Sequence, residues 1–421
     1  MSDPFATISI IGLGYIGLPT AAVFASRKVK VIGVDVNQHA VDTINRGEIH
    51  IVEPELDNVV RAAVADGYLR ATTKPEPADA FLIAVPTPFK DGPTGCHHPD
   101  VDFIEAATKS IAPVLKKGDL VILESTSPVG ATEQMAFWMA QARPDLSFPQ
   151  THGEASDIRV AHCPERVLPG QVLRELVQND RVIGGMTPRC SKAAAQLYKA
   201  FVQGECVITS ARTAEMCKLT ENSFRDVNIA FANELSIICD RLNINVWELI
   251  RLANRHPRVN ILQPGPGVGG HCIAVDPWFI VSAAPTEAKL IRAAREVNDS
   301  KPGWVIEKIK LSVAEFLQEN PGKTAKDMSI ACFGISFKPD IDDLRESPAL
   351  DIVRALSVIH PGPVFVVEPN IKTVPMDLNN VELVDEIRGM DADLKVLLVD
   401  HKQFKTGLTP HGKFLDCKGI W

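Results

Sequence analysis

The first half of the chain alternates short apolar runs with longer stretches in which apolar residues recur at helical spacing. Residues 6–27 (ATISIIGLGYIGLPTAAVFASR) predict a strand, a glycine-rich turn and a helix of small residues, and residues 30–35 (KVIGVD) predict a second strand. Apolar runs at 80–86 and 120–126 flank a helical stretch at 101–117. This alternation predicts βαβ units in a parallel sheet.

The middle of the chain has a different pattern. Residues 213–244 keep helical spacing over a length unusual in an α/β domain, which predicts one long helix. Helical patterns at 245–256 and 286–317 flank a glycine-rich loop at 265–277. Residues 320–327 (NPGKTAKD) predict a linker, and strand-like runs follow it. We therefore expect an α/β fold with parallel sheets: a Rossmann-like domain at 1–211, a helical domain with the long helix at 212–320, and a second Rossmann-like domain at 321–421.

Composition and charge agree with a globular protein. Of the 421 residues, 45% are hydrophobic and 23% charged, and the net charge of −8 argues against a general nucleic-acid or anionic-membrane surface. The N-terminus lacks the pattern of an export signal, and no run of about 18 apolar residues predicts a membrane span. The nine cysteines are scattered without a CxxC pair, which favours reduced thiols and a cytoplasmic location.

The glycine-rich turn is the first candidate binding site. Gly12, Gly14 and Gly17 follow a strand and begin a helix, and Asp35 ends the next strand 18 residues after Gly17. This arrangement predicts NAD, because the glycines let a pyrophosphate approach the helix N-terminus and a carboxylate at Asp35 accepts hydrogen bonds from a ribose. Asp35 would repel a 2′-phosphate, which favours NAD over NADP. Further cofactor-binding candidates are Tyr15 and Ile16 in the turn, and Thr87 and Thr126 at the ends of later strands.

The second candidate site is Cys272 in GPGVGGHCIAVDP. The neighbouring glycines allow a close approach to its sulfur, and Asp276, four residues later, can orient or deprotonate a water or the thiol. The spacing alone fits a nucleophile and a buried structural cysteine equally well. A zinc site would need Cys272 with His271, His97 and His98, but the chain lacks a second closely spaced pair of ligands. We therefore expect no metal.

Several motifs together resemble the nucleotide-sugar 6-dehydrogenase family, the UDP-glucose and GDP-mannose dehydrogenases, over nearly the whole chain. They are GLGYIGLP, ESTSPVG, CPERVLPG, EMCKLTENSFRDVNIAFANE, GPGVGGHCIAVDP and FKPDIDDLRESP. The resemblance implies two Rossmann-like domains and a long helix that also builds a homodimer. It also implies oxidation of the C6 alcohol of a sugar nucleotide to a carboxylate, with two NAD consumed.

The family's catalytic residues can be carried over to matching positions. Cys272 would attack the aldehyde, give a thiohemiacetal and then a thioester, and release the acid on hydrolysis. Lys218 and Asn222, four residues apart on the predicted long helix, match a lysine and an asparagine that stabilise the oxyanions. Glu165 and Thr126 match residues that act on the hydrolytic water. Without the resemblance, each of these side chains would be an ordinary helix-surface, loop or turn residue.

The resemblance also implies a substrate site, as basic groups suit a diphosphate. Arg258 matches an arginine that reaches the partner subunit's site, and Arg345 matches a residue that contacts NAD. An arginine on a protein surface is often merely solvated. The positions that correspond to substrate-binding residues are Arg166, Val167, Lys218, Asn222, Arg225, His256, Arg258, Gly269 and Lys338.

One departure concerns the sugar. UDP-glucose dehydrogenases carry a second glutamate four residues after the first, where this chain has Pro169. The motifs are most similar to the branch that oxidises UDP-N-acetyl-D-mannosamine for surface polysaccharides such as enterobacterial common antigen. Alternatives are the same reaction on UDP-N-acetylglucosamine or UDP-N-acetylgalactosamine, a two-electron β-hydroxyacid-type dehydrogenase, and a non-catalytic nucleotide-sugar sensor.

Overall fold

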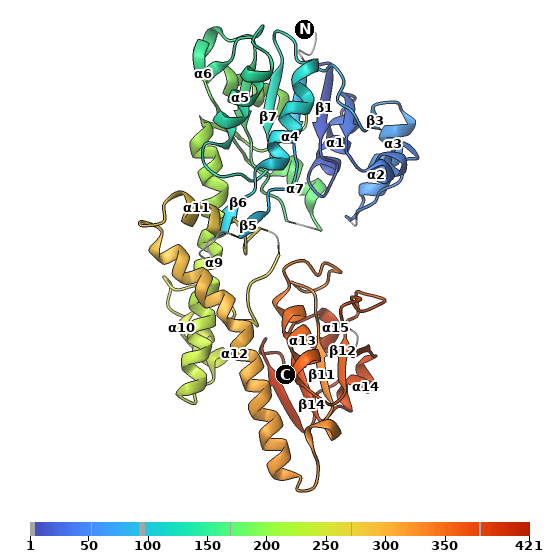
Figure 1. Cartoon of the computed structure of the whole chain (residues 1–421), viewed down its shortest axis with the longest axis vertical. Helices are drawn as coiled ribbons and strands as arrows, with labels where there is room; N and C mark the ends of the chain where they lie inside the picture. Colours follow the sequence, from blue (N-terminus) through green and yellow to red (C-terminus); the bar gives the residue numbers. More distant parts are fainter. Residues whose placement is uncertain (1–4, 52, 92–96, 169, 271, 379) are drawn as a thin grey trace. The chain divides into compact units, whose positions relative to one another are not determined.

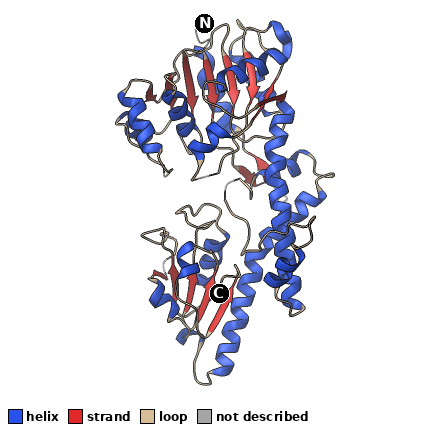
Figure 2. Cartoon of the chain, turned by 180° about the vertical axis from the view of Figure 1, so that it is seen from behind, coloured by secondary structure: helices blue, strands red, loops and turns tan. Residues whose placement is uncertain are grey.

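A computed structural model describes residues 5–51, 53–91, 97–168, 170–270, 272–378 and 380–421. The chain forms two compact units, Met1–Glu221 with Trp278–Ala283 and Asn222–Pro277 with Ala284–Trp421. Each unit contains one large sheet, whose strands are drawn in red in Figure 2.

The first unit contains a sheet of eight strands in the order β10-β9-β8-β7-β4-β1-β2-β3, as far as the described residues show. The core of this order, β3-β2-β1-β4-β7, is that of a doubly wound nucleotide-binding fold. The strands are β1 (Thr7–Ile11), β2 (Lys30–Val34), β3 (Leu69–Thr72), β4 (Ala80–Ile83), β7 (Leu120–Leu123), β8 (Arg159–His162), β9 (Arg181–Gly185) and β10 (Cys206–Ser210), with a separate hairpin of β5 (Phe89–Asp91) and β6 (His97–Pro99).

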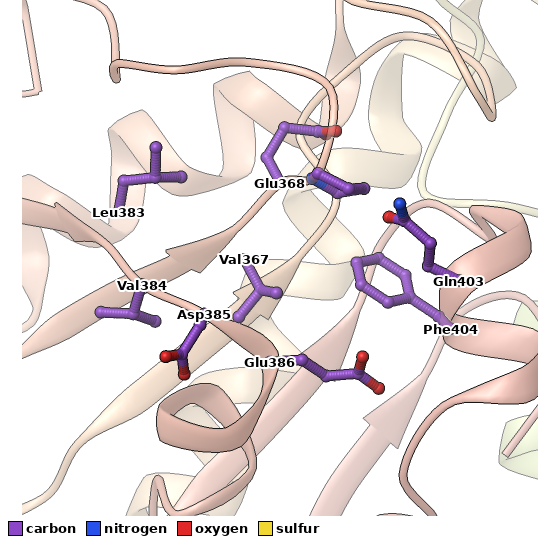
Figure 3. A pocket seen from close by; sticks show the side chains of 9 residues that line it. Val367, Glu368, Leu383, Val384, Asp385, Glu386, Gln403 and Phe404 are labelled. Carbon is purple, nitrogen blue, oxygen red and sulfur yellow. The ribbon is translucent and has the colours of Figure 1, made fainter.

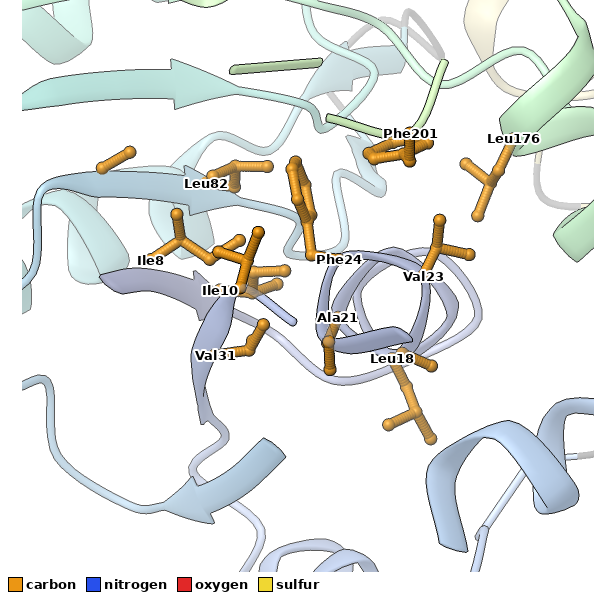
Figure 4. Packing of buried hydrophobic residues seen from close by; sticks show 14 of the residues in the cluster. Ile8, Ile10, Leu18, Ala21, Val23, Phe24, Val31, Leu82, Leu176 and Phe201 are labelled. Atoms are coloured by element: carbon orange, nitrogen blue, oxygen red, sulfur yellow. The ribbon is translucent and has the colours of Figure 1, made fainter. Parts of the chain in front are cut away.

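Helices connect these strands and cover both faces of the sheet (Figure 1). Side chains alternate between the two faces along β4: Ala80 and Leu82 join one hydrophobic cluster, and Phe81 and Ile83 join another. Figure 4 shows the first cluster, in which Phe24 from α1 packs near Leu82. Burial on both faces explains why the central strands are continuously apolar. The helices are α1 (Gly17–Ser26), α2 (Gln38–Asn45), α3 (Leu56–Ala65), α4 (Asp102–Ile111), α5 (Ala131–Ala142), α6 (Pro149–His152), α7 (Val172–Gln178) and α8 (Pro188–Tyr198).

One pairing in this sheet is antiparallel, which differs from the predicted parallel sheet. β8 and β9 run in opposite directions, with Ala161 opposite Gly185 and His162 opposite Gly184. The described part of the segment between these strands contains one helix, the seven-residue α7. The chain therefore re-enters the sheet at the same end at which β8 leaves it, as an antiparallel pair requires.

Long helices dominate the middle of the chain. α9 (Ala211–Arg241) and α12 (Lys289–Glu319) each contain 31 residues, as the periodicity predicted, and between them lie α10 (Val246–Ala253) and α11 (Asp276–Ala283). α9 begins in the first unit and ends in the second.

The second unit ends in a parallel sheet of five strands in the order β13-β12-β11-β14-β15. This arrangement and α9 confirm the predicted fold class of two Rossmann-like sheets and a long helix. Within the described ranges, no helix is both long enough and apolar enough to cross a membrane. The elements are β11 (Ile330–Phe333), α13 (Pro348–Ile359), β12 (Val364–Val367), β13 (Val381–Leu383), α14 (Glu386–Met390), β14 (Leu394–Leu397), α15 (Lys402–Thr406) and β15 (Lys413–Asp416).

Candidate active site

The glycine turn after β1 has the geometry that a bound pyrophosphate requires. Gly12 has a φ of +91°, and a Cβ there would lie 2.6 Å from the carbonyl oxygen of Ala84. A Cβ on Gly17, the first residue of α1, would lie 1.8 Å from the carbonyl oxygen of Gly12. A Cβ on Gly14 would meet nothing within 4 Å, so the backbone faces open space at the start of α1. The turn therefore fits the pyrophosphate of NAD.

Asp35 lies beside this turn, directly after β2. Its carboxylate accepts hydrogen bonds from the backbone nitrogens of Leu13 and Asn37, both at 2.9 Å. These contacts hold a negative charge next to the turn, where it suits ribose hydroxyls and repels a 2′-phosphate. Tyr15, 39% exposed, and the partly buried Ile16 lie within the turn.

Thr87 and Thr126 lie beyond the carboxyl ends of the neighbouring strands β4 and β7. The hydroxyl of Thr87 donates to the carbonyl oxygen of Thr126 at 2.5 Å. This bond joins two loops at the sheet edge where ligands of such folds bind.

Glu215 on α9 anchors the same region. Its carboxylate accepts hydrogen bonds from the backbone nitrogen of Gly130 at 2.7 Å, and from the backbone nitrogen and hydroxyl of Thr132 at 2.8 and 2.6 Å. Burial raises the pKa of Glu215. The start of α5, and with it the loop that holds Thr126, is thereby fixed to α9.

Glu165, Arg166 and Val167 follow β8. Glu165 is buried, and its carboxylate accepts a hydrogen bond from the backbone nitrogen of Val167 at 2.7 Å. Arg166 forms an ion pair with Glu221 on α9 at 2.6 Å, so part of its positive charge is already neutralised within the protein. Pro169 lies outside the described residues.

Glu53 fixes the end of the same loop. Its buried carboxylate accepts hydrogen bonds from the backbone nitrogens of Gly170 and Val172, at 2.9 and 2.8 Å. Val172 is the first residue of α7, so Glu53 satisfies donors that the start of a helix leaves without an intrahelical partner. The backbone near Glu165 is therefore held from both sides.

α9 carries Lys218 and Asn222 one turn apart. The side-chain nitrogen of Asn222 donates to the carboxylate of Asp276 at 2.5 Å. Asn222 and Asp276 are 8% and 3% exposed, so water is largely kept from this bond. Lys218 is partly buried.

Cys272 lies in the turn that leads into α11. Its carbonyl oxygen accepts hydrogen bonds from the backbone nitrogens of Val275 and Asp276, at 3.1 and 2.8 Å. These bonds fix Asp276 at the first position of α11, one turn after the partly buried Cys272. His271 lies outside the described residues.

The glycines before Cys272 pack closely against the C-terminal Rossmann-like part of the same unit. A Cβ on Gly269 would lie 2.3 Å from the carbonyl oxygen of Glu346. Gly270 has a φ of +85°, and a Cβ there would lie 2.9 Å from the ring of Phe337. The backbone nitrogen of Gly270 also donates to Glu346 at 3.3 Å. Larger residues do not fit at either position, so the glycines bring this loop against the segment between β11 and α13.

The predicted basic residues of the second unit differ in their surroundings. Arg225, His256 and Arg258 are exposed. Lys338 is partly buried and its ammonium lies 5.9 Å from the ring centre of Phe337. Arg345 forms a bidentate ion pair with Asp343, with contacts of 2.6–3.1 Å.

The structure thus groups the predicted residues in two sets. The first unit contains the glycine turn, Asp35, Thr87, Thr126, the Glu165 loop and Lys218, and the second contains Asn222, the basic residues and the Cys272 loop. Asn222 and Asp276 are in direct contact, whereas Arg345 is engaged by a neighbouring acid that the sequence analysis did not consider.

α9 carries a buried polar stripe that was not predicted from the sequence. Glu215, Asn222, Asp226 and Asn233 recur at intervals that place them on one face, and all are buried. Asn233 accepts a hydrogen bond from the backbone nitrogen of Gly265 at 2.9 Å, so the stripe also holds the start of the Cys272 loop. The signal was available in the sequence as polar residues at helical spacing within an otherwise apolar pattern.

A cavity of about 400 Å³ lies at the carboxyl ends of β12 and β13 (Figure 3). Glu368, Asp385 and Glu386 give its wall a negative character that would disfavour a diphosphate, and no predicted site residue lines it. In the described part of the chain, no group of three or more His, Cys, Asp or Glu side chains has the arrangement of a metal site.

Comparison with known proteins agrees with this geometry. Three models of the UDP-glucose/GDP-mannose dehydrogenase family match: the NAD binding domain at residues 6–202, the central domain at 212–300 and the UDP binding domain at 331–421.

Individual relatives are similar over almost the full length. A UDP-N-acetyl-D-mannosamine dehydrogenase of Yersinia pestis is 68% identical over 99% of both chains. An NDP-N-acetyl-D-galactosaminuronic acid dehydrogenase of Ralstonia nicotianae is 66% identical, over 99% of this chain and 96% of the relative. The solved structure of the UDP-N-acetyl-mannosamine dehydrogenase Cap5O from Staphylococcus aureus superposes with a TM-score of 0.84 and 42% identity, over 98% of this chain and 95% of that one.

Proposed function

Because the chain belongs to the UDP-glucose/GDP-mannose dehydrogenase family, an NAD-dependent group, we propose that it oxidises C6 of UDP-N-acetyl-D-mannosamine to the carboxylate. The observation that supports oxidation by way of a cysteine is the buried hydrogen bond between Asn222 and Asp276. Asp276 begins α11, one helical turn after Cys272. The similarity to the Yersinia pestis enzyme supports the sugar. The uronic acid product would serve surface polysaccharides such as enterobacterial common antigen.

In the first oxidation, Lys218 takes the proton of the C6 hydroxyl or stabilises the alkoxide. Bound NAD supplies the hydride acceptor, once for each of the two oxidations. The residues that would hold it are Gly12, Gly14, Tyr15, Ile16, Gly17 and Asp35 at the first turn, Thr87 and Thr126 at the later strand ends, and Arg345.

In the second oxidation, the Cys272 sulfur adds to the aldehyde carbon to form a thiohemiacetal. This step restores the tetrahedral carbon from which a second hydride can leave, and the product is a thioester. The amide of Asn222 and the ammonium of Lys218 stabilise the oxyanion. Asp276 receives the thiol proton, and its bond to Asn222 supports that orientation.

Hydrolysis releases the acid. Glu165 takes a proton from the attacking water, which Thr126 helps to hold, and Asp276 returns its proton to the Cys272 sulfur, which leaves as a thiol. The hydrogen bond from the Val167 nitrogen fixes one oxygen of Glu165, which supports a defined direction for the other.

The diphosphate and sugar would be bound by the remaining predicted residues. The exposed positions of Arg225, His256 and Arg258 support contacts with a ligand or a partner subunit. Because Arg166 already pairs with Glu221, we assign it the sugar rather than the diphosphate. The full set is Arg166, Val167, Lys218, Asn222, Arg225, His256, Arg258, Gly269 and Lys338.

We also propose a homodimer in which Arg258 reaches the partner site. On α9, Phe224, Phe231 and Ile238 are spaced seven residues apart and are 69%, 57% and 45% exposed. Large apolar side chains in a row on a helix face support burial against a second copy.

The proposed division of labour follows the predicted domains. Residues 1–211 would bind NAD, 212–320 would supply the dimer interface and the central catalytic residues, and 321–421 would bind the UDP-sugar. A cytoplasmic location is supported by the eight described cysteines, none of which is joined in a disulfide bond.

A second candidate substrate is UDP-N-acetyl-D-galactosamine. The Ralstonia nicotianae relative is nearly as similar as the Yersinia pestis enzyme, at 66% against 68% identity. Overall similarity therefore favours the manno sugar only slightly, and configuration at C2 and C4 has to be measured.

The deciding experiment counts the NADH released from UDP-N-acetylmannosamine, UDP-N-acetylglucosamine, UDP-N-acetylgalactosamine and UDP-glucose with excess NAD. We expect about two NADH per UDP-N-acetylmannosamine. We also expect a kcat/KM at least about 100-fold above that for UDP-glucose, which corresponds to about 2.7 kcal/mol, because a 2-acetamido group needs hydrogen-bond partners that a UDP-glucose site lacks. A higher kcat/KM for UDP-N-acetylgalactosamine would make that sugar the substrate in place of UDP-N-acetylmannosamine. A yield of one NADH per sugar would overturn the proposed mechanism of two oxidations.

A further inference from the structure

A cluster of buried charged groups lies at the carboxyl edge of the first sheet. Glu124 follows β7, Arg181 begins β9 and Tyr198 ends α8, and all three are buried. The hydroxyl of Tyr198 donates to Glu124 at 2.5 Å, and a guanidinium nitrogen of Arg181 lies 4.0 Å from the same oxygen. The Arg181 guanidinium also lies 5.0 Å from the ring centre of Tyr198.

The antiparallel pairing of β8 and β9 brings this cluster to Glu165. His162 lies opposite Gly184 in that register. Glu165 follows the end of β8 by three residues and Arg181 begins β9, and the charge of Glu165 acts on the Arg181 guanidinium. A parallel strand at this place would present its other end, so Arg181 lies at the same end of the sheet as Glu165 because β9 is reversed.

The hydrogen bonds of this cluster are incomplete. Four of its buried atoms have no hydrogen-bond partner among the described residues. They are both terminal nitrogens of Arg181, one oxygen of Glu124 and one oxygen of Glu165. Buried polar atoms without partners cost stability and are concentrated where function needs them. Arginine keeps its charge in proteins, so one positive charge faces two carboxylic acids here.

We propose that Glu124 and Glu165 share one proton inside this enclosure, that Arg181 balances the single negative charge, and that Glu124 is thereby a positioning residue for Glu165. The inference rests on the proposed function, in which Glu165 takes the proton of the hydrolytic water. While Glu124 holds the proton, Glu165 is a carboxylate. When Glu124 ionises, a second negative charge appears in the enclosure, and Arg181 no longer balances the charge beside Glu165.

The titration of Glu124 supports this arrangement. Burial raises the pKa of Glu124 to about 7, against the lowering effects of Arg181 and the Tyr198 hydroxyl, and the charge of Glu165 raises it further. Cys163 lies in the same enclosure, and burial raises its pKa to about 12, so it stays a neutral thiol. His162 is also buried, and burial lowers its pKa to about 3, which keeps the imidazole neutral.

The first test measures thioester hydrolysis in single turnovers, as acid formed after both NADH have appeared, between about pH 6 and pH 8.5. Glu124→Gln has the same shape but cannot ionise. The rate of hydrolysis by the wild-type protein should change in a step near pH 7, and the rate of the variant should show no such step. The increase in rate across this pH range should therefore be at least about threefold smaller in the variant than in the wild type. Asp119→Asn is the control, since Asp119 is a buried acid at the other end of β7.

The second test needs no catalysis and follows the urea midpoint with pH. The pKa of Glu124 in the folded protein, about 7, exceeds the ordinary value of 4.5, so the folded state binds an extra proton between these values. Its contribution to stability is complete below about pH 4.5 and is lost as the pH rises through 7. Glu124→Gln should remove this fall of the midpoint, and Asp119→Asn should keep it.

The outcomes separate the two proposals. If wild-type protein releases no NADH from any UDP-sugar, the proposed function fails, while the urea titration still decides whether Glu124 holds a proton. If wild-type protein releases two NADH but Glu124→Gln matches it in both pH profiles, the shared proton is excluded. If Glu124→Gln does not fold, Tyr198→Phe decides: loss of its hydrogen bond should move the step near pH 7 upward, and an unmoved step contradicts the proposal.

Discussion

The amide of Asn222 connects α9 to the loop that carries Cys272. Its bond to Asp276, at 2.5 Å, is enclosed by protein, where a charge-assisted hydrogen bond is strong. The backbone bonds from Val275 and Asp276 to the Cys272 carbonyl oxygen fix the same turn. A carboxylate held in this way keeps one direction relative to the backbone of Cys272, which would suit the proton transfers of the proposed mechanism.

The first prediction at the residue scale concerns the thiol. Cys272→Ser preserves size but replaces a good nucleophile with a poor one, so acid formation should fall by at least about 10³-fold, with at most slow production of aldehyde. The measurement is uronic acid per NADH. Cys206→Ser is a matched control, since Cys206 is a partly buried thiol on β10. Near wild-type acid formation by Cys272→Ser would exclude the covalent route.

At the scale of elements, α9 and α12 meet through polar side chains rather than through a purely apolar seam. Arg295 pairs with Asp226 at 2.6 Å, and both are almost fully buried. Asn298 donates to Asp226 at 2.8 Å, and Lys301 donates to Ser236 at 2.6 Å. Contacts at successive turns of α12 fix the register of the two helices, which a continuous apolar stripe would leave freer.

The second prediction tests this seam. Asp226→Leu removes the buried partner of Arg295, which keeps only its pair with the half-exposed Asp299, and should lower the free energy of unfolding by about 3 kcal/mol. Adding Arg295→Met should recover most of the loss, since an apolar pair often replaces a buried ion pair without cost. Urea unfolding measures both. Lys308→Ala, which breaks an exposed pair with Asp240 between the same helices, should cost less than about 1 kcal/mol.

A double variant no more stable than Asp226→Leu alone would show that the seam acts through packing and not through paired charge. An equal loss in Lys308→Ala would show that burial does not decide the strength of these pairs.

The elements also show what the sequence could predict. The strands β1, β2, β4 and β7 and the two 31-residue helices follow from apolar periodicity, which the folded chain obeys wherever one face is buried. The reversal of β9 does not follow from periodicity, because a buried strand has the same pattern in either direction.

Side-chain partners were harder to predict than the positions of the candidate site. The glycine turn, Asp35 and the Cys272 loop depend on local spacing, so their geometry could be anticipated. The anchors Glu53 and Glu215 bind backbone groups 117 and 85 residues away, and no local pattern signals such a pair. All the residue roles carried over from the family stay predictions, those of Cys272, Lys218 and Glu165 among them.

At the scale of the whole molecule, α9 has the reverse of the usual amphipathic arrangement. Its polar residues Asn222, Asp226 and Asn233 are buried, whereas Phe231 is 57% exposed. A helix with this arrangement is suited to contact a second protein surface, and a twofold dimer would cover the apolar side with a copy of itself.

The third prediction is that Phe231→Glu weakens the proposed dimer. A charge without a partner at the centre of an apolar interface should raise the dimer Kd by at least about 100-fold, which corresponds to about 2.7 kcal/mol. Light scattering over a dilution series measures the change. Phe137→Glu is the control, since Phe137 on α5 is 49% exposed and lies outside this face. A monomeric wild-type protein at micromolar concentration would contradict the dimer.

The close packing of Gly269 against Glu346 also limits how this gene can evolve. The loop that positions the proposed nucleophile packs against residues about 75 positions later in the chain. The terminal domain therefore determines the shape of this loop in addition to binding a ligand. Recombination that exchanges the terminal domain to acquire another sugar would have to transfer both surfaces together. We therefore expect new specificities in this lineage to arise by point substitution more readily than by exchange of modules.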